Sequence, residues 1–244
     1  MSGAKKVLEK LWRLCYTVTM NVTLKALTLV TGHYGSGKTN FALNLACQQA
    51  ELGKSVTLVD LDIVNPYFRS SDYPDLLSSR GIRLIAPKFA GQTLDAPGLP
   101  PDILAAFDKT YGDNDVTIID VGGDSVGSTA LGRFAPRIRA MDSSMLYVVN
   151  NNRPEIAAPR NAVAILREIE TVSRLSASAI VNNSHLMGGT TPEVIESSVE
   201  YAGQVSELTG LPILLHTAPI ALAGLIRGVD NLMPVEIYVK KPWE

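Results

Sequence analysis

Residues 32–39, Gly-His-Tyr-Gly-Ser-Gly-Lys-Thr, contain the residue types that bind phosphate. They match the pattern G-x-x-x-x-G-K-[ST] in full, between a strand-like apolar run and a helical pattern. Glycines at positions 35 and 37 allow the backbone to turn, so that successive N–H groups point at phosphate oxygens. The helix that follows adds the positive end of its dipole. The sequence therefore predicts a nucleotide phosphate site in this loop.

The residues of this loop have distinct expected contacts. Lys38 is expected to reach the β- and γ-phosphates, and it is a candidate catalytic residue. The hydroxyl of Thr39 is expected to bind Mg²⁺. The candidate nucleotide-binding residues in and beside the loop are Gly32, His33, Tyr34, Gly35, Ser36, Gly37, Lys38, Thr39 and Asn40.

Acidic residues end two further apolar runs. Asp62 is the second candidate catalytic residue, because an acid there can orient the attacking water or hold a magnesium-bound water. Asp120 ends another run and suits a Mg²⁺ site that acts through water, so the predicted metal set is Thr39, Asp62 and Asp120. Gly123 would let a backbone N–H approach the γ-phosphate. The alternative is that such acids cap helices or turns, and this alternative is favoured for Asp60.

Short runs rich in Val, Ile and Leu alternate with helical patterns along the chain. Nearly continuous apolar runs are typical of strands buried on both faces. This alternation predicts a three-layer α/β fold of the P-loop NTPase type, with a mainly parallel sheet of seven to eight strands and functional residues at one edge. Helices are expected at 38–52, 155–173 and 192–208, the last with Thr191 as N-cap and Pro192 at its first position. The expected strands are 26–31, 55–60, 82–86, 116–120, 144–150, 178–183, 212–216 and 235–239.

Length and composition narrow the class of protein. A chain of 244 residues fits one P-loop nucleotide-binding domain over 25–244, preceded by an N-terminal extension over 1–24. A net charge of −2 gives no reason to expect nucleic-acid binding, and only two cysteines favour a cytoplasmic protein without disulfides. No apolar run is long enough to span a membrane. Residues 5–15 have helical apolar spacing between basic residues, which fits a packed extension better than a helix on a membrane surface.

The loop 32–39, the stretch VTLVDLDIVNPYFRS at 56–70 and the stretch VTIIDVGGD at 116–124 together resemble the MinD/ParA group of P-loop ATPases, relatives of nitrogenase iron protein and CobQ-type enzymes. The resemblance covers residues 25–240 and implies ATP and Mg²⁺ as ligands, with Asp62 tied to hydrolysis and Asp120 to magnesium. It also implies that the base is read by Asn182 or Asn183 and near Pro219. No N-K-x-D string follows the sixth strand, which favours ATP over GTP.

His33 occupies the position of the group's signature lysine, which crosses a homodimer interface to the partner's nucleotide. A neutral imidazole does not replace a permanent cation, so such a homodimer would need another positive charge. Arg69 and Arg153 lie in strand-end loops and are candidates, although surface or ion-pair roles are favoured for both.

Three functions are consistent with these observations. The leading hypothesis is a Mg-ATP-dependent switch for a protein partner, in which the loops 62–72 and 121–130 respond to ATP and ADP. The second is an ATP-dependent ligase or small-molecule kinase of the dethiobiotin synthetase and CobQ type, with an acceptor pocket built by residues 86–101, Tyr67, Lys88 and Arg133. The third is a metal-cofactor maturation factor, and it is not supported, because the spacing of Cys47, His185 and His216 matches no metal-ligand pattern.

Overall fold

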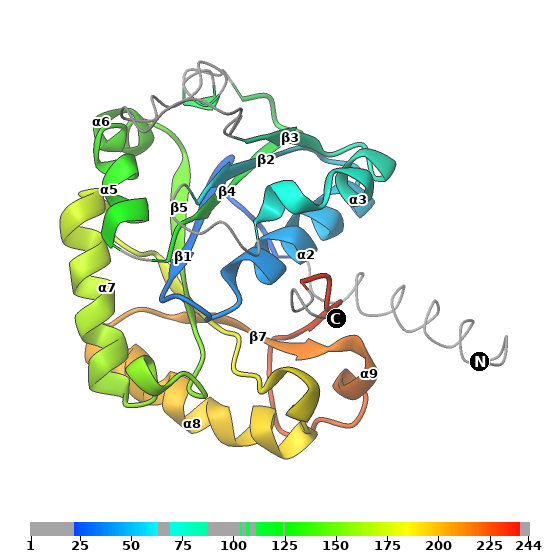
Figure 1. The fold of residues 1–244 in the computed structure, drawn as a ribbon, viewed down its shortest axis with the longest axis vertical. Helices are drawn as coiled ribbons and strands as arrows, with labels where there is room; N and C mark the ends of the chain where they lie inside the picture. Colours follow the sequence, from blue (N-terminus) through cyan, green and yellow to red (C-terminus); the bar gives the residue numbers. More distant parts are fainter. Residues whose placement is uncertain are drawn as a thin grey trace, which may run out of the picture.

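The protein is an eight-stranded parallel sheet with helices on both faces (Figure 1). The computed structural model describes residues 22–62, 69–86, 103, 106–107, 111–123 and 125–239. The strand order is β3-β2-β4-β1-β5-β6-β7-β8, and every pairing is parallel. This confirms the predicted three-layer α/β architecture, with β1 between β4 and β5 near the middle of the sheet.

The strands agree closely with the predicted apolar runs. They are β1 Leu27–Gly32, β2 Ser55–Leu61, β3 Arg83–Ile85, β4 Asp115–Val121, β5 Ser143–Val149, β6 Ala179–Asn182, β7 Ile213–Pro219 and β8 Leu232–Val235. The last differs from the expected run 235–239. Pro234 is tolerated in β8 because this strand lies at the edge of the sheet. Residues 236–239 instead bond to helix α2, where side-chain amides take the place of a neighbouring strand.

Seven helices in the described ranges accompany the strands. They are α2 Lys38–Glu51, α3 Pro74–Ser79, α5 Ser125–Gly132, α6 Ala135–Arg139, α7 Pro159–Ser173, α8 Pro192–Thr209 and α9 Ile220–Ala223, and short 3₁₀ helices are η1 Ser70–Asp72, η2 Pro154–Ile156 and η3 Met187–Gly189. The predicted cap of α8 is confirmed, because the Thr191 side chain accepts from the Val194 N–H and Pro192 begins the helix. Helix α7 begins at Pro159, later than predicted, because residues 154–156 form η2.

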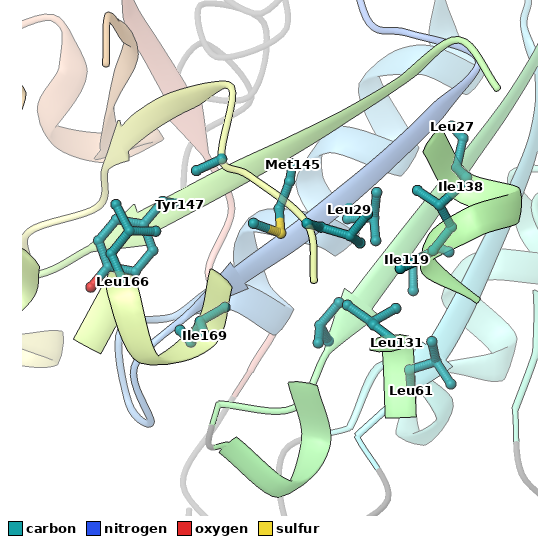
Figure 2. Close-up of a cluster of buried hydrophobic side chains, with 14 of the residues drawn as sticks. Leu27, Leu29, Leu61, Ile119, Leu131, Ile138, Met145, Tyr147, Leu166 and Ile169 are labelled. Atoms are coloured by element: carbon teal, nitrogen blue, oxygen red, sulfur yellow. The ribbon is translucent and has the colours of Figure 1, made fainter. Parts of the chain in front are cut away.

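Two apolar layers cover the two faces of the sheet. On one face, Leu29, Ile119 and Tyr147 pack against side chains of α5, α6, α7 and α8, as Figure 2 shows for Leu131, Ile138, Leu166 and Ile169. On the other face, Val30 and Ile118 pack against Phe41 and Leu45 of α2. Neighbouring residues of one strand thus face opposite layers, and both are buried. Burying each large aliphatic side chain contributes about 1.5–3 kcal/mol, so the sheet is a rigid base for the loops at its edge.

All strands run in the same direction, so their carboxyl ends share one edge of the sheet. In the register, Asp120 of β4 lies beside Val30 of β1 on one side and beside Asp60 of β2 on the other. The predicted phosphate loop and the predicted acids are therefore neighbours.

No helix in the described part of the chain has the length and hydrophobicity needed to cross a bilayer. Residues 1–21 of the expected extension lie outside the described residues. Val22 packs against α2, and its carbonyl accepts from the Gln49 side chain at 3.3 Å.

Candidate functional site

The predicted phosphate loop turns sharply between β1 and α2. Gly37 precedes α2 in a left-handed conformation, with φ 85° and ψ 22°. A Cβ at this position would lie 2.3 Å from Nδ2 of Asn183, so both the conformation and the space require glycine. Within the loop, the Ser36 N–H donates to the carbonyl of His33 at 3.1 Å. Lys38 is buried, and its Nζ donates to the same carbonyl at 3.2 Å, so its ammonium group lies over the loop.

Three aspartates gather beside the loop, as their strand positions predict. Asp60, Asp62 and Asp120 are all buried. Asp60 accepts from the backbone N–H of Asp62 and of Ser71, each at 3.0 Å, so its two oxygens hold a turn together. This fits the turn-capping alternative favoured for Asp60. Asp120 accepts from the Ser70 hydroxyl at 2.6 Å through Oδ2.

Asp120 has an unusual electrostatic environment. Burial and, to a smaller extent, the charge of neighbouring Asp60 raise the pKa of its carboxyl to about 7, although Ser70, Lys38 and Thr39 act in the opposite direction. Its Oδ1 is buried and has no hydrogen-bond partner among the described residues. A buried carboxylate oxygen without a partner, close to the Thr39 hydroxyl, suits a hard cation that prefers oxygen ligands. The residues therefore fit Mg²⁺, held by the Thr39 hydroxyl and by Asp120.

Gly123 follows β4 and lies against the phosphate loop. A Cβ at this position would lie 2.6 Å from Nζ of Lys38 and 2.9 Å from the backbone N of Tyr34. Any larger residue would separate the β4 loop from the phosphate loop. This close approach is what its predicted role beside the γ-phosphate requires.

A cavity of about 290 Å³ extends from the phosphate loop along the ends of β6, β7 and β8. At the loop end, the predicted residues that line it are Tyr34, Gly35, Gly37, Lys38, Thr39, Asn40 and Asp62. Gly32, His33 and Ser36 do not line it. The Ser36 hydroxyl is buried and has no hydrogen-bond partner among the described residues. At the far end, the lining is Pro219, Val235, Ile237 and Val239, and Met187 and Thr217 also line the cavity. Asn183 and His185 line it beside Gly37 of the loop.

The two asparagines proposed for base recognition have different environments. Asn183 lines the cavity, but its Nδ2 donates to the Ser36 carbonyl at 2.7 Å, and its Oδ1 accepts from the Thr217 hydroxyl. Asn182 does not line the cavity. Its Nδ2 lies 2.8 Å from the Ser198 hydroxyl and 2.9 Å from Nδ1 of His216, within the protein interior. Pro219 lines the far end of the cavity, where its predicted role places it.

Asn40 lines the cavity, but its amide contacts the protein itself. Its Nδ2 donates to the Glu236 carbonyl at 2.9 Å, and its Oδ1 accepts from the N–H groups of Tyr238 and Val239 at 2.9 and 3.2 Å. One turn later, Asn44 donates to the Glu236 carbonyl at 2.8 Å. These bonds hold residues 236–239 in the wall of the cavity, so Asn40 shapes the far end rather than presenting its amide to a ligand.

Among the cations considered from the sequence, Arg153 lines the cavity. Its Nε donates to the Gly35 carbonyl at 2.5 Å. His33 lies outside the cavity, with its Nε2 3.7 Å from Glu155, and burial lowers its pKa. Arg69 does not line the cavity, and its backbone N–H donates to Asp72 at 3.0 Å.

Other lining residues were not predicted from the sequence. His185 is in contact distance of the phosphate loop, since its Nε2 would lie 3.0 Å from a Cβ on Gly37. Burial and, to a smaller extent, the nearby charge of Arg153 lower the pKa of His185 to about 4. The Met187 N–H donates to His185 Nδ1 at 3.3 Å, so the proton of the neutral ring is on Nε2, facing the loop. A strand-end histidine carries no sequence signal that separates this role from a structural one.

The acceptor pocket of the ligase or kinase hypothesis is not assembled in the described part of the chain. Tyr67, Lys88 and residues 87–101 lie outside the described residues, and Arg133 is exposed and does not line the cavity. Within the described ranges, no group of three or more His, Cys, Asp and Glu side chains is placed to hold a metal ion.

No protein-family profile matches the chain, and no curated protein matches it. Solved structures do match. FtsY from the chloroplast of Physcomitrella patens is 17% identical with a TM-score of 0.56, over 95% of this chain and 71% of that one. FtsY from Mycoplasma mycoides is 17% identical with a TM-score of 0.54, over 87% and 69%. The signal recognition particle 54 kDa protein from Aeropyrum pernix, solved with GDP, is 16% identical with a TM-score of 0.53, over 86% and 46%.

These matches correct one expectation. Membership of the MinD/ParA group was wrong, because the matching solved structures are FtsY and the signal recognition particle protein, and neither sequence comparison supports that group. The phosphate loop and the strand-end acids follow from phosphate chemistry at the edge of a parallel sheet, so they identify a fold rather than a family. The MinD/ParA group therefore no longer supports the homodimer that the resemblance implied. What the comparisons and the topology show together is the P-loop NTPase fold.

Proposed function

We propose that this protein binds Mg-ATP in the cavity between the phosphate loop and β8, hydrolyses it, and acts as a nucleotide-dependent switch for a protein partner. The observation that carries the proposal is the continuity of one cavity. One end has the phosphate loop, Lys38, Thr39 and Asp62, and the other end has Pro219 and the apolar side chains of Val235, Ile237 and Val239. A charged end and an apolar end in one cavity match a nucleotide, which is a polyanion joined to a flat aromatic base.

The residues at the charged end have complementary roles in this proposal. The loop N–H groups and Lys38 would bind the phosphates, and Thr39 and Asp120 would hold Mg²⁺, which neutralises developing charge on the phosphates when bound. Asp62 lines the same cavity, and in this proposal it would orient the attacking water. Gly123 supports a contact between its N–H and the terminal phosphate through its close approach to the loop.

We infer adenine rather than guanine as the base at the far end. Guanine presents adjacent N–H donors that a carboxylate binds best, whereas adenine needs one donor and one acceptor. Among the described residues that line the cavity, Asp62 is the only carboxylate, and it lies at the phosphate end. Since one solved structure of similar fold contains GDP, GTP is the competitor to test.

The link between the acids and η1 supports a switch. Ser70 and Ser71 of η1 are bonded to Asp120 and Asp60, directly beside the proposed magnesium site. A cation on Oδ1 of Asp120 would draw charge from the same carboxylate whose Oδ2 accepts from the Ser70 hydroxyl, and would weaken that bond. Ligand binding would thereby change the position of η1, which could form part of a surface that a partner recognises.

Titration of the purified full chain with ATP, GTP and ADP in the presence of Mg²⁺ tests the proposal. We expect saturable binding that favours ATP, slow hydrolysis, and loss of binding in Lys38→Ala. Lys54→Ala is the control, because the Lys54 ammonium bonds to the Asp113 carbonyl at 3.0 Å, away from the cavity. Oligomeric state with and without ATP shows whether a second copy is a partner. Absence of saturable binding by folded wild-type protein would overturn the proposal, and tighter binding of GTP would overturn the choice of ATP.

A further inference from the structure

Arg153 has a guanidinium group at the phosphate end of the cavity with most of its donors unused. A guanidinium carries five N–H donors. Only the Nε of Arg153 has a protein acceptor among the described residues, the Gly35 carbonyl at 2.5 Å. Within those residues no carboxylate forms an ion pair with it. The side chain is half-buried, so its position is set by the protein rather than by free rotation in water.

The loop that carries Arg153 is fixed at both ends. At its start, Asn150 is fully buried, and its Oδ1 accepts from the N–H groups of Asn152 and His185 at 3.0 and 3.2 Å. At its end, Ile156 is fully buried, and its carbonyl accepts from the Tyr201 hydroxyl at 2.6 Å. The Arg153 N–H itself closes the turn onto the Asn150 carbonyl at 3.2 Å. A charge held this firmly needs little reorganisation when a ligand reacts.

Two positively charged side chains from different elements therefore contact the phosphate loop. Lys38 comes from α2 and bonds to the His33 carbonyl, while Arg153 comes from the β5 loop and bonds to the Gly35 carbonyl. Both line the cavity, and Asp62 is the carboxylate that shares the lining with them. A planar, multidentate donor beside a phosphate loop is suited to phosphate oxygens that gain charge during transfer.

We propose that Arg153 is a catalytic residue that supplies, from the same chain, the second positive charge on the transferring phosphoryl group. The proposal rests on the proposed nucleotide site and deepens it. Its Nε would keep the bond to Gly35, while the Nη groups contact the terminal phosphate. Phosphoryl transfer to water moves the γ-phosphoryl group from the β-phosphate oxygen to a water oxygen. The bond between the γ-phosphorus and the bridging oxygen breaks, the proton of the attacking water passes to solvent, and the products are ADP and inorganic phosphate. Arg153 lowers the barrier by binding charge and transfers no proton.

The test separates binding from charge stabilisation. Three quantities are measured on the full chain with Mg²⁺: the affinity for ADP, the gain in that affinity when aluminium fluoride is added, and the rate of single-turnover ATP hydrolysis. Aluminium fluoride mimics the transferring phosphoryl group. For Arg153→Ala we expect ADP affinity within about threefold of wild type, and hydrolysis and the fluoride-induced gain each reduced about 100-fold or more. Arg153→Gln, which can still donate a hydrogen bond but has no charge, should behave like Arg153→Ala. Arg160→Ala removes an exposed arginine from the start of α7 and should match wild type.

The outcomes distinguish the two proposals. If wild type binds no nucleotide, the proposed function fails and this inference fails with it. If wild type binds and hydrolyses ATP but Arg153→Ala retains full hydrolysis and full fluoride response, only the role of Arg153 is refuted. If Arg153→Ala loses ADP affinity and hydrolysis in parallel and Arg153→Gln restores both, Arg153 merely shapes the loop through Gly35, and its catalytic role is refuted. Thermal unfolding of each variant shows whether the fold is retained.

Discussion

Replacing Asp120 by Asn should stabilise the ligand-free protein at neutral and alkaline pH, although it removes a residue of the proposed magnesium site. Burial and the neighbouring Asp60 raise the pKa of Asp120 from 3.8 to about 7. Between these two values the folded protein holds a proton that the unfolded chain has released. Raising the pH through this window therefore lowers the stability of the wild type, whereas Asp120→Asn lacks this loss.

The size of the effect follows from the shift. A difference of about three pKa units corresponds to at most about 4 kcal/mol, since each unit is about 1.4 kcal/mol. The amide also places an N–H group where Oδ1 has no partner among the described residues, which costs about 1–3 kcal/mol. That cost is the same at every pH. The stability difference between variant and wild type should thus rise from about pH 4 to about pH 7 and then remain constant.

Urea unfolding across this pH range, without nucleotide or Mg²⁺, measures the difference directly. Asp142→Asn is the matched control, because Asp142 is an exposed carboxylate paired with Lys25 at 2.8 Å. Its difference from wild type should vary little with pH. Adding Mg-ATP should stabilise wild type much more than Asp120→Asn. Parallel pH profiles for wild type and Asp120→Asn would refute the reasoning, because they would mean that Asp120 has the same pKa in the folded and unfolded states.

Three further changes test other parts of the structure. Gly123→Ala should weaken Mg-ATP binding by about tenfold or more in a titration, because its Cβ would lie 2.9 Å from the backbone N of Tyr34 and would push the β4 loop away from the phosphate loop. Unchanged affinity would mean that the two loops separate easily. Burial lowers the pKa of His185 to about 4, so between this value and pH 6.5 the unfolded chain binds a proton that the folded protein does not, and wild type loses stability as the pH falls. His185→Asn should remove up to about 3 kcal/mol of this loss in urea unfolding. An unaltered acid profile would contradict this. Thr191→Ala should cost about 1 kcal/mol of stability through loss of the α8 cap, and Thr191→Ser should restore it.

The sheet and the phosphate loop were predictable because local chemistry determines them. Continuous apolar runs have few alternatives to a strand buried on both faces, and parallel strands place their carboxyl ends together. Asp62 and Asp120 end such strands, so their proximity to Lys38 followed from topology alone. The alternation of short strands and helices was enough to predict the architecture, whereas the sequence motifs were not enough to predict the family.

Features that depend on long-range pairing were not predictable. Residues 236–239 read as a strand, yet Asn40 and Asn44 of α2 provide the donors and acceptors that a neighbouring strand would have provided. The bond between Arg153 and Gly35 joins residues far apart in the sequence, and no local pattern distinguishes it from an exposed arginine. Both features require knowledge of which loops meet at the sheet edge.

The adjacent asparagines at the end of β6 show how far the sequence alone can predict which side chains face the cavity. Successive side chains of a strand point to opposite faces, so only one of Asn182 and Asn183 can face the cavity. The sequence supplies no preference, because both are amides with the same hydrogen-bonding groups. The register decides: Asn182 pairs with His216 and bonds into the interior, so Asn183 is directed at the phosphate loop and bonds to Ser36. A register shifted by one residue would exchange the two side chains and leave the loop without this support.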